Sequence, residues 1–450
     1  METTQAFQTL DRFRRTVYDL VLGHRKDTMF ELMEAVLVAQ GANNLVHLSL
    51  EPVFRRRWPS APDALAEGSL DVKELRRLLH RQLAAEPALG RPVWALDGTV
   101  WPRPAAEKSA ERTWVHRVAP GRPQEGVVPG WEYQWLVDVP ADHGSWVRPL
   151  DVSRRTPATD SPTLLALGQL RHALACRPPG TPRPVVTMDS SYDVLDLAQA
   201  VHDTRQPLEV DILVRLPRRR RFYRQPPPYS GRGGPRKHGA AFNLKKPETL
   251  GTPDRSAGLL DPDRGRVQVE VWDDLHDQHN ATLSFPVVRV QAERLPKAGR
   301  RPEPLWLAWL GKEPLADPLD YWRYYQRRFT VEHCLRFSKS DLGWTTVRPG
   351  DPEAADRWSW LLVVVLWQLW LARSLVADLR LPWEQPKAIS ELSPGRVRRA
   401  IAPILARVAL PTREVHPRGK SPGRRPGEHP KPRARCPTHF RRPKRAAKAA

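Results

Sequence analysis

Cysteine is scarce in this sequence: 450 residues contain only Cys176, Cys334 and Cys436. The three are far apart, and none lies in a CxxC or Cys/His pattern with the spacing of a zinc site. This pattern excludes a disulfide framework or a zinc module and indicates a reducing cytoplasm. The first 20 residues also lack a basic stretch followed by an apolar one, so we expect no export signal.

Long apolar runs are missing as well. The longest candidate, Trp360–Ala372, has 13 residues, whereas a membrane-spanning helix needs roughly 20. We therefore expect this segment to be a buried core helix and the protein to have no membrane partner.

Basic residues, by contrast, are abundant. The chain has 72 Lys and Arg against 50 Asp and Glu, a formal net charge of +22. An excess of this size predicts a polyanionic partner, nucleic acid before membrane, although a solubility effect is the simpler alternative. Residues 412–450 hold 13 Lys and Arg against two Glu, which is +11, or half of the whole charge. Because this stretch is also poor in apolar residues, we expect a basic, disordered tail.

The chain begins with a helical pattern and then changes to strands. Residues 1–88 carry apolar residues at helical spacing, which predicts an N-terminal helical domain that either binds DNA or serves as a packing module. From residue 89 to 216, short apolar runs such as Val93–Leu96 and Pro184–Met188 alternate with helical segments, the first of which Ser161-Pro162 is expected to cap. This order is typical of an α/β sheet with helices on its faces, and we assign 89–216 to the first part of a catalytic core.

The second half interrupts and then resumes this core. Residues 217–313 open with four consecutive arginines and show β alternation, which predicts a basic, partly β insertion. Residues 314–380 return to helix: Asp317-Pro318 caps a long helix expected to reach about Ser338, and Asp351-Pro352 caps the next. Residues 381–411 form a last helical segment. The four arginines are candidate DNA ligands: Arg218, Arg219, Arg220 and Arg221.

Two aspartates directly follow apolar strands. Asp97 ends the run Val93–Leu96, and Asp189 ends Pro184–Met188. Open α/β folds build sites at the ends of central strands, and hard oxygen ligands there suit Mg²⁺ or Mn²⁺. Acidic residues after strands are also common as helix caps, and Asp193 and Asp196 are rivals for the second metal ligand. Asp193 has the position of a helix cap, so we favour Asp189.

A third acid lies on the predicted long helix. Tyr325, Arg328, Glu332 and Lys339 fall within a stripe about 60° wide at roughly 100° per residue. A carboxylate flanked by two cations and a phenol suits the gripping of phosphate beside a metal ion. The alternative is an Arg–Glu pair four residues apart on a solvated helix face.

The spacing Tyr325-x2-Arg328-x3-Glu332-x6-Lys339 resembles the signature of one large group of bacterial insertion-sequence transposases with DDE catalysis. The resemblance covers about residues 90–375. It implies an RNase H-like core interrupted by a β-rich insertion, with Asp97, Asp189 and Glu332 as the catalytic acids and ligands of two metal ions. It also implies that Tyr325, Arg328 and Lys339 contact the transposon end near the cleaved phosphate.

The same resemblance suggests a role for tryptophan. Some members of the group stack an insertion-domain tryptophan on a base flipped from the transposon end, and Trp306 and Trp309 precede Glu332 at a suitable distance. Packing of these strand tryptophans in the core is the alternative.

The sequence therefore predicts a DNA transposase that cleaves and joins the ends of an insertion sequence. Its expected partners are double-stranded DNA, both transposon ends and target, and a second copy of the chain when DNA is bound. Its expected location is the bacterial cytoplasm, at the nucleoid. Two alternatives stay open, a host-adopted derivative that binds DNA without activity and another RNase H-like DNA nuclease.

Overall fold

The computed structural model of the chain describes most residues between Thr3 and His439. The described residues are 3–41, 44–86, 90–116, 126–141, 144–159, 161–229, 231, 234–294, 302–408, 410–415, 423, 426–427, 429 and 433–439. No described helix is long and apolar enough to cross a membrane.

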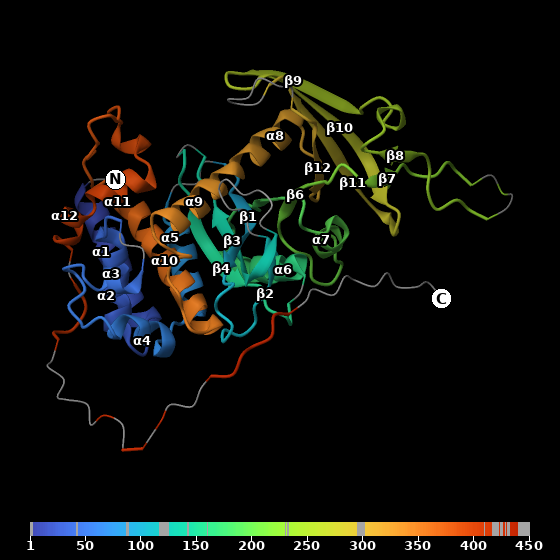
Figure 1. Ribbon diagram of the computed structural model, residues 1–450. Coiled ribbons are helices and arrows are strands. Elements are labelled where there is room, and N and C mark those ends of the chain that lie inside the picture. Colours follow the sequence, from blue (N-terminus) through green and yellow to red (C-terminus); the bar gives the residue numbers. More distant parts are fainter. Residues whose placement is uncertain are drawn as a thin grey trace.

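The chain begins with helices, as Figure 1 shows in blue. Local signals set several boundaries; for example, the Asp71 side chain accepts a hydrogen bond from the Glu74 N–H and so caps the last of these helices. The elements are α1 (Thr3–Thr16), the π-helical turn η1 (Val17–Val21), α2 (Lys26–Val38), α3 (Leu45–Leu48), α4 (Ser60–Glu67) and α5 (Val72–Ala84).

In the described part of the chain, 12 strands then form one mixed sheet, so the predicted α/β class is confirmed. Its path runs β2-β3-β1-β5-β6-β12-β11-β10-β7-β8, with β4 paired to β3 and β9 to β10. The strands are β1 (Val93–Pro102), β2 (Thr113–His116), β3 (Val127–Asp138), β4 (Arg148–Arg154), β5 (Val185–Met188), β6 (Asp211–Arg215), β7 (Arg221–Tyr223), β8 (Ala241–Asn243), β9 (Arg255–Asp261), β10 (Gly265–Asp277), β11 (Asn280–Ala292) and β12 (Leu305–Leu310).

The centre of the sheet combines both strand directions. β1 is antiparallel to β3 and parallel to β5, and β5 is parallel to β6. The parallel pairs are joined through α6 (Pro162–Ala175) and α7 (Val194–Val201), and the Ser161 side chain caps α6 as its sequence predicts. All four residues of β5 are buried, as expected for a strand covered on both faces.

The sheet continues without a break into the region predicted as an insertion. β12 pairs antiparallel with β6 on one side and with β11 on the other. The long β10–β11 hairpin then carries the outer strands, at the upper right of Figure 1. Residues 217–313 therefore extend the central sheet instead of forming a separate one. A short helix, η2 (Pro247–Thr249), lies beside β8.

Helices close the fold. Asp317 and Asp351 cap α8 and α10 as predicted. The long helix expected from residue 317 to 338 is divided at Arg328, whose N–H bonds to the Tyr325 carbonyl three residues back. The elements are α8 (Pro318–Arg327), α9 (Phe329–Ser340), α10 (Pro352–Ala372), η3 (Ile389–Glu391), α11 (Pro394–Ala400) and α12 (Ala402–Leu405).

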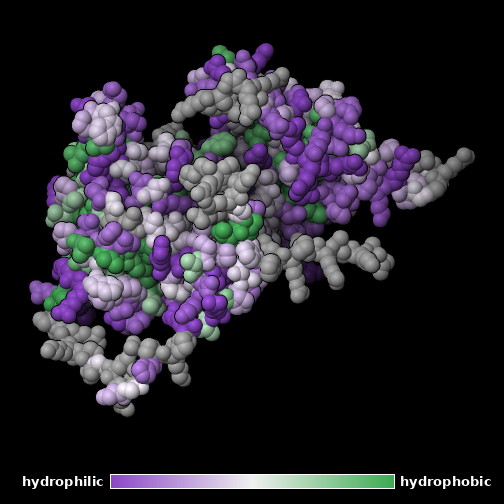
Figure 2. All heavy atoms as spheres, in the orientation of Figure 1, coloured by the Kyte–Doolittle hydropathy of each residue, from purple (hydrophilic) through white to green (hydrophobic). Residues whose placement is uncertain are grey.

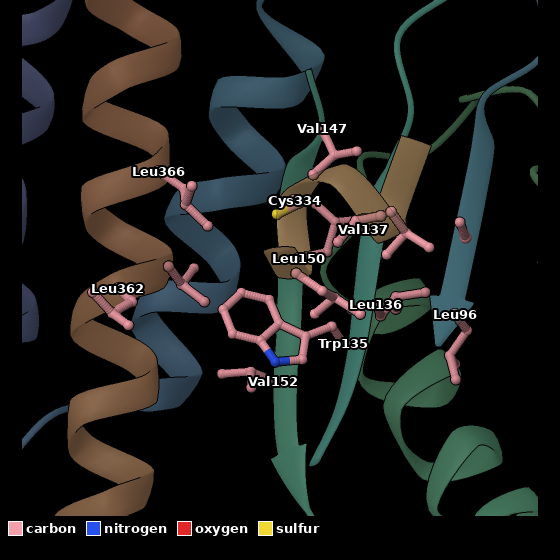
Figure 3. Close-up of a cluster of buried hydrophobic side chains, with 14 of the residues drawn as sticks. Leu96, Trp135, Leu136, Val137, Val147, Leu150, Val152, Cys334, Leu362 and Leu366 are labelled. Atoms are coloured by element: carbon pink, nitrogen blue, oxygen red, sulfur yellow. The ribbon is translucent and has the colours of Figure 1, made fainter. Parts of the chain in front are cut away.

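The main core lies between α10 and one face of the sheet. Figure 3 shows Leu362 and Leu366 of α10 directed toward Trp135, Leu150 and neighbouring sheet residues. On its other side α10 packs against α1, α2 and α4, whereas α5 contacts β4 of the sheet directly. The segment Trp360–Ala372, predicted to be a buried core helix, is thus part of α10 and is covered by the sheet on one side and by N-terminal helices on the other.

The predicted tail is described only in part. Arg55 donates a hydrogen bond of 2.5 Å to the Thr412 hydroxyl, and the Cys436 and His439 N–H groups bond to the carbonyls of Glu107 and Arg112 beside β2. The remaining stretches of residues 412–450, to which the prediction of disorder also applies, lie outside the described residues.

Candidate active site

The two strand-end aspartates lie at the same level of the sheet. Leu96 of β1 is the register partner of Met188 of β5, and Asp97 and Asp189 are the next residue on each strand. Neighbouring parallel strands are about 4.8 Å apart, so the two aspartate side chains extend from adjacent backbone positions. Asp97 is buried, with 8% of its surface exposed, whereas Asp189 is partly exposed.

The third acid reaches this pair through an arginine. Arg328 lies at the junction of α8 and α9, and α9 packs on β1. Its Nη2 is 3.1 Å from Oδ2 of Asp97, and its Nη1 is 3.4 Å from Oε1 of Glu332. Arg328 is only 6% exposed. The guanidinium therefore contacts two carboxylates from different parts of the chain. The Arg328–Glu332 pair of the simpler interpretation is present, but its arginine is buried and also pairs with Asp97.

The charges at this site are strongly coupled. Burial raises the pKa of Asp97 to about 6; the Arg328 charge opposes this rise, and the Asp189 and Glu332 charges add to it. Burial acts to lower the pKa of Arg328, but the carboxylates outweigh it and the net shift is upward. The buried Asp97 thus lies near the partly exposed Asp189 and the exposed Glu332, and the repulsion between these carboxylates favours a cation among them.

Tyr325 and Lys339, the other two residues of the helical stripe, are also affected by the charges of the acids. Burial raises the pKa of Tyr325 to about 12, and the hydroxyl also senses the charges of Arg328, Arg215, Asp189 and Asp97. Burial lowers the pKa of Lys339, an effect that the Asp97 charge partly offsets. The charges that act on Tyr325 and Lys339 thus include that of Asp97, to which Arg328 is paired, despite the division of the helix.

The carboxylates fit a divalent cation in kind and in charge, because hard cations prefer oxygen ligands and relieve the repulsion between acids. Within the described part of the chain, no three His, Cys, Asp or Glu side chains converge closely enough to hold a metal ion as they stand. The Arg328 guanidinium occupies the space between Asp97 and Glu332. A metal bound by all three acids requires this guanidinium to turn away.

Local hydrogen bonds distinguish Asp189 from Asp193, one of the alternative candidates for the second metal ligand. Oδ1 of Asp189 accepts the Ser191 N–H at 2.9 Å and the Ser191 hydroxyl at 2.5 Å. Asp193 instead caps α7 by accepting the N–H groups of Leu195 and Asp196. Asp193 also contacts Arg220 at 3.4 Å. Its carboxylate therefore has structural partners away from Asp97.

Comparison with known proteins agrees with this acid-rich site. The sequence profile described as "DDE superfamily endonuclease" matches residues 19–277, more than half of the chain. The chain belongs to this DDE endonuclease family. The matched region includes Asp97 and Asp189 and ends before Glu332. The assignment of Glu332 as the third acid therefore rests on its contact with Arg328 and on the sequence signature.

The comparisons with individual proteins are more distant. No curated protein has a significant match. Among solved structures, the chain is similar to one in the cryo-EM structure of the piggyBac transposase synaptic complex with hairpin DNA, with 10% sequence identity. The alignment covers 92% of this chain and 74% of the other, with a TM-score of 0.37.

The arginines predicted to bind DNA are not equivalent in this DDE endonuclease. Arg218 pairs with Glu303 at 2.5 Å, and Arg220 contacts Asp277 as well as Asp193. Arg221 is exposed on β7. Arg219 is exposed and, together with Arg220, lines an open groove of about 480 Å³ next to Asp189. The groove is lined by Ser161, Pro162, Thr163, Ser190, Ser191, Tyr192, Asp193, Pro217, Arg219 and Arg220.

Trp306 and Trp309 lie in the core in this structure. Both belong to β12 and are 2% and 1% exposed. Trp306 packs against Phe242 and Trp272, and the Trp309 Nε1–H donates to the Glu313 carbonyl at 2.8 Å. These contacts favour the core-packing alternative, because neither ring presents an open face to a nucleic-acid base.

Sequence reasoning missed four residues around the acids. Ser191 and Tyr192 lie two and three residues after Asp189, and the run Asp-Ser-Ser-Tyr at the end of a buried strand was the available signal. Glu132 and Arg155 form an ion pair of 3.3 Å, and the Glu132 carboxylate lies next to Gly98. No local pattern marks this second pair, because strand pairing brings it to the site.

Proposed function

We propose that this protein is a DNA transposase of the DDE type, which cleaves and joins the ends of an insertion sequence with two Mg²⁺ or Mn²⁺ ions held by Asp97, Asp189 and Glu332. The observation that carries the proposal is the contact of the buried Arg328 guanidinium with both the buried Asp97 and the half-exposed Glu332. It joins acids from the sheet and from α9 and includes the helical signature residues in the same site.

The strand arrangement supports the RNase H-like part of the proposal. The order β4-β3-β1-β5-β6 combines an antiparallel β1-β3-β4 unit with two strands parallel to β1. The second acid follows β5, and the third arrives on a helix after the strands contributed by residues 217–313. This order fits a DDE core with a β-rich insertion before its last catalytic helix.

The side chains have separable tasks in this mechanism. Bound at the three carboxylates, divalent ions would activate a water or a DNA 3′-hydroxyl and stabilise charge on the leaving oxygen. Once released from Asp97, Arg328 grips nonbridging phosphate oxygens with its planar fork, and Lys339 adds a point charge. Tyr325, whose phenol is protonated at neutral pH, donates a hydrogen bond to the same phosphate.

The wider surface is suited to DNA. Figure 2 shows mainly hydrophilic residues over the outer strands of the sheet. The net charge of +22 and the groove beside Asp189 provide electrostatic attraction for the phosphate backbone. We further propose that the protein acts as a homodimer on paired DNA ends, at the bacterial nucleoid.

A nuclease that cleaves without joining is the second candidate, because the matching family is described as an endonuclease. One assay separates the two candidates. Purified protein is incubated with Mg²⁺ and DNA fragments carrying the inverted repeats that flank its gene, and both cleaved ends and joined products are measured. Cleavage and joining support a transposase, and cleavage alone supports the nuclease. The absence of both, with end binding intact, supports a host-adopted derivative.

A further inference from the structure

Tyr192 contains a buried hydroxyl that the mechanism above leaves unused. The side chain is 4% exposed and packs in the main core, three residues after Asp189. Among the residues that the structure describes, its hydroxyl has no hydrogen-bond partner, and the oxygen is closed to water. Burying a hydroxyl without a partner costs about 1–3 kcal/mol. Such a group at the edge of an acid cluster requires an explanation.

The surroundings of the hydroxyl indicate its partner. Burial raises the pKa of Tyr192 well above its ordinary value, and the next largest contributions come from the charges of Asp97 and Asp189. The phenol thus stays protonated and remains a hydrogen-bond donor. A DNA phosphate is larger than water and cannot reach a hydroxyl that water does not reach. The nearby carboxylates are therefore better candidates than the substrate.

The two aspartates differ in how they are held. Asp189 accepts two hydrogen bonds from Ser191, one from the hydroxyl and one from the N–H group. Asp97 is held by the Arg328 guanidinium and by the Gly98 N–H. If Arg328 turns away to bind phosphate, Asp97 loses its side-chain partner. A metal-binding carboxylate normally keeps a hydrogen-bond donor that fixes its orientation.

We propose that Tyr192 is a positioning residue for Asp97, and that its hydroxyl donates a hydrogen bond to the Asp97 carboxylate when a divalent cation is bound in place of Arg328. Tyr192 would then do for Asp97 what Ser191 does for Asp189. This inference rests on the metal site of the proposed function. It assigns the orphan hydroxyl to the metal-bound state, which explains why the hydroxyl has no partner here.

The test is Mn²⁺ binding to the full-length protein without DNA, measured by calorimetry for wild type and Tyr192→Phe. The substitution keeps the ring, so packing is retained. We expect about tenfold weaker Mn²⁺ binding, the lower end of the usual effect of losing such a donor. The unfolding temperature without metal should rise, because the substitution removes a buried hydroxyl without a partner and no hydrogen bond of the metal-free protein is lost. The rise of unfolding temperature on adding Mn²⁺ should be smaller than in wild type.

Tyr321→Phe is the matched control. The Tyr321 hydroxyl accepts hydrogen bonds from the Leu315 N–H and from Arg255, away from the acids. This variant should unfold at a lower temperature and bind Mn²⁺ as wild type does. Wild-type Mn²⁺ affinity in Tyr192→Phe, with or without a lower unfolding temperature, would overturn the inference. Wild-type affinity in Asp97→Asn would instead overturn the metal site on which the inference rests.

Discussion

Arg328 places its guanidinium 3.1 Å from the carboxylate of Asp97, and both side chains are buried. An exposed ion pair contributes little to stability, but breaking a buried one leaves a charge without a partner in a low-dielectric site. The contact therefore connects the fold to the chemistry, because the residue that neutralises Asp97 here is the one proposed to grip phosphate during cleavage.

Replacing Asp97, Asp189 or Glu332 by Ala should abolish metal-dependent cleavage of a cognate DNA end and leave end binding largely intact. The reason is that each acid supplies metal ligands, whereas the basic groove and tail supply most of the DNA affinity. Cleavage and gel-shift assays on the same preparations check this. Asp193→Ala is the comparison: losing its helix cap should cost about 1 kcal/mol of stability without loss of cleavage. Normal cleavage by Asp189→Ala would exclude our assignment of the second acid.

Replacing Arg328 by Ala should stop single-turnover cleavage of a pre-bound end, and Arg328→Lys should restore little, because a point charge cannot form a bidentate grip. Lys339→Ala should also slow cleavage. Arg328→Ala should lose about 3 kcal/mol of stability, since Asp97 is left buried without its counter-ion. Mg²⁺ should then raise the unfolding temperature of Arg328→Ala more than that of wild type. Near wild-type cleavage by all three variants would contradict the role of the signature residues.

Neighbouring arginines allow a matched test of the groove. Arg219 lines the groove beside Asp189, whereas Arg218 is paired with Glu303. Arg219→Ala should weaken DNA binding and reduce the slope of log affinity against log salt by about 0.9, the effect of one phosphate contact. Arg218→Ala should change the slope less, because Glu303 already compensates its charge. Equal effects of the two substitutions would show that general charge, and not the groove, determines binding.

Truncation after Glu414 should remove non-specific DNA affinity and no chemistry. The deleted segment contains 12 Lys and Arg and one Glu, so several counterion-releasing contacts are lost and the salt dependence of binding should flatten. Keeping Thr412 preserves its contact with Arg55. Filter binding at several salt concentrations and cleavage of pre-bound ends are the measurements. An unchanged salt slope would show that the tail does not bind DNA.

His80 should make stability depend on pH. It lies on α5 with its ring edge-on to Trp94, is 2% exposed, and burial lowers its pKa to about 4 from an ordinary value of 6.5. Arg177, the other charged group that acts on it, lowers the pKa further. Because the folded-state pKa is depressed, the neutral ring contributes full stability above pH 6.5. This contribution is lost as the pH falls toward 4, by up to about 3 kcal/mol.

Urea unfolding of wild type and His80→Gln between pH 4.5 and 7.5 measures this effect. The variant should show a weaker pH dependence over that range. The exposed His47 provides the control, since His47→Gln should leave the dependence as it is in wild type. An unchanged pH dependence in His80→Gln would assign the effect to other groups.

Local rules predicted the features that depend on neighbours in sequence. Ser161, Asp317 and Asp351 cap their helices as expected, because capping involves only the next few N–H groups. The strands before Asp97 and Asp189 were likewise visible as apolar runs. The division of the helix at Arg328 was not, since it accompanies an ion pair with a residue of β1.

Tertiary pairing also decided where the tryptophans lie. Trp306 and Trp309 alternate with aliphatic residues in a strand that sequence patterns could assign either to an insertion or to the core. Pairing with both β6 and β11 places β12 inside the sheet, and its two faces belong to two buried clusters, with Trp306 in one and Trp309 in the other. Nothing in the segment itself specifies this position, just as nothing near Tyr192 in the sequence reveals that its hydroxyl lacks a partner.

The junction of β6 and β12 has a mechanical consequence. Residues 212–215 and 307–310 are joined by a ladder of backbone hydrogen bonds, not by a flexible linker. A force on the outer hairpin that is directed along the strands loads these bonds in shear, so they resist together instead of opening one at a time. If DNA is held by both the hairpin and the acids, the stiff sheet keeps these two contact points at a constant separation. The distance from the recognised base pairs to the cut would then be fixed by the length of the sheet.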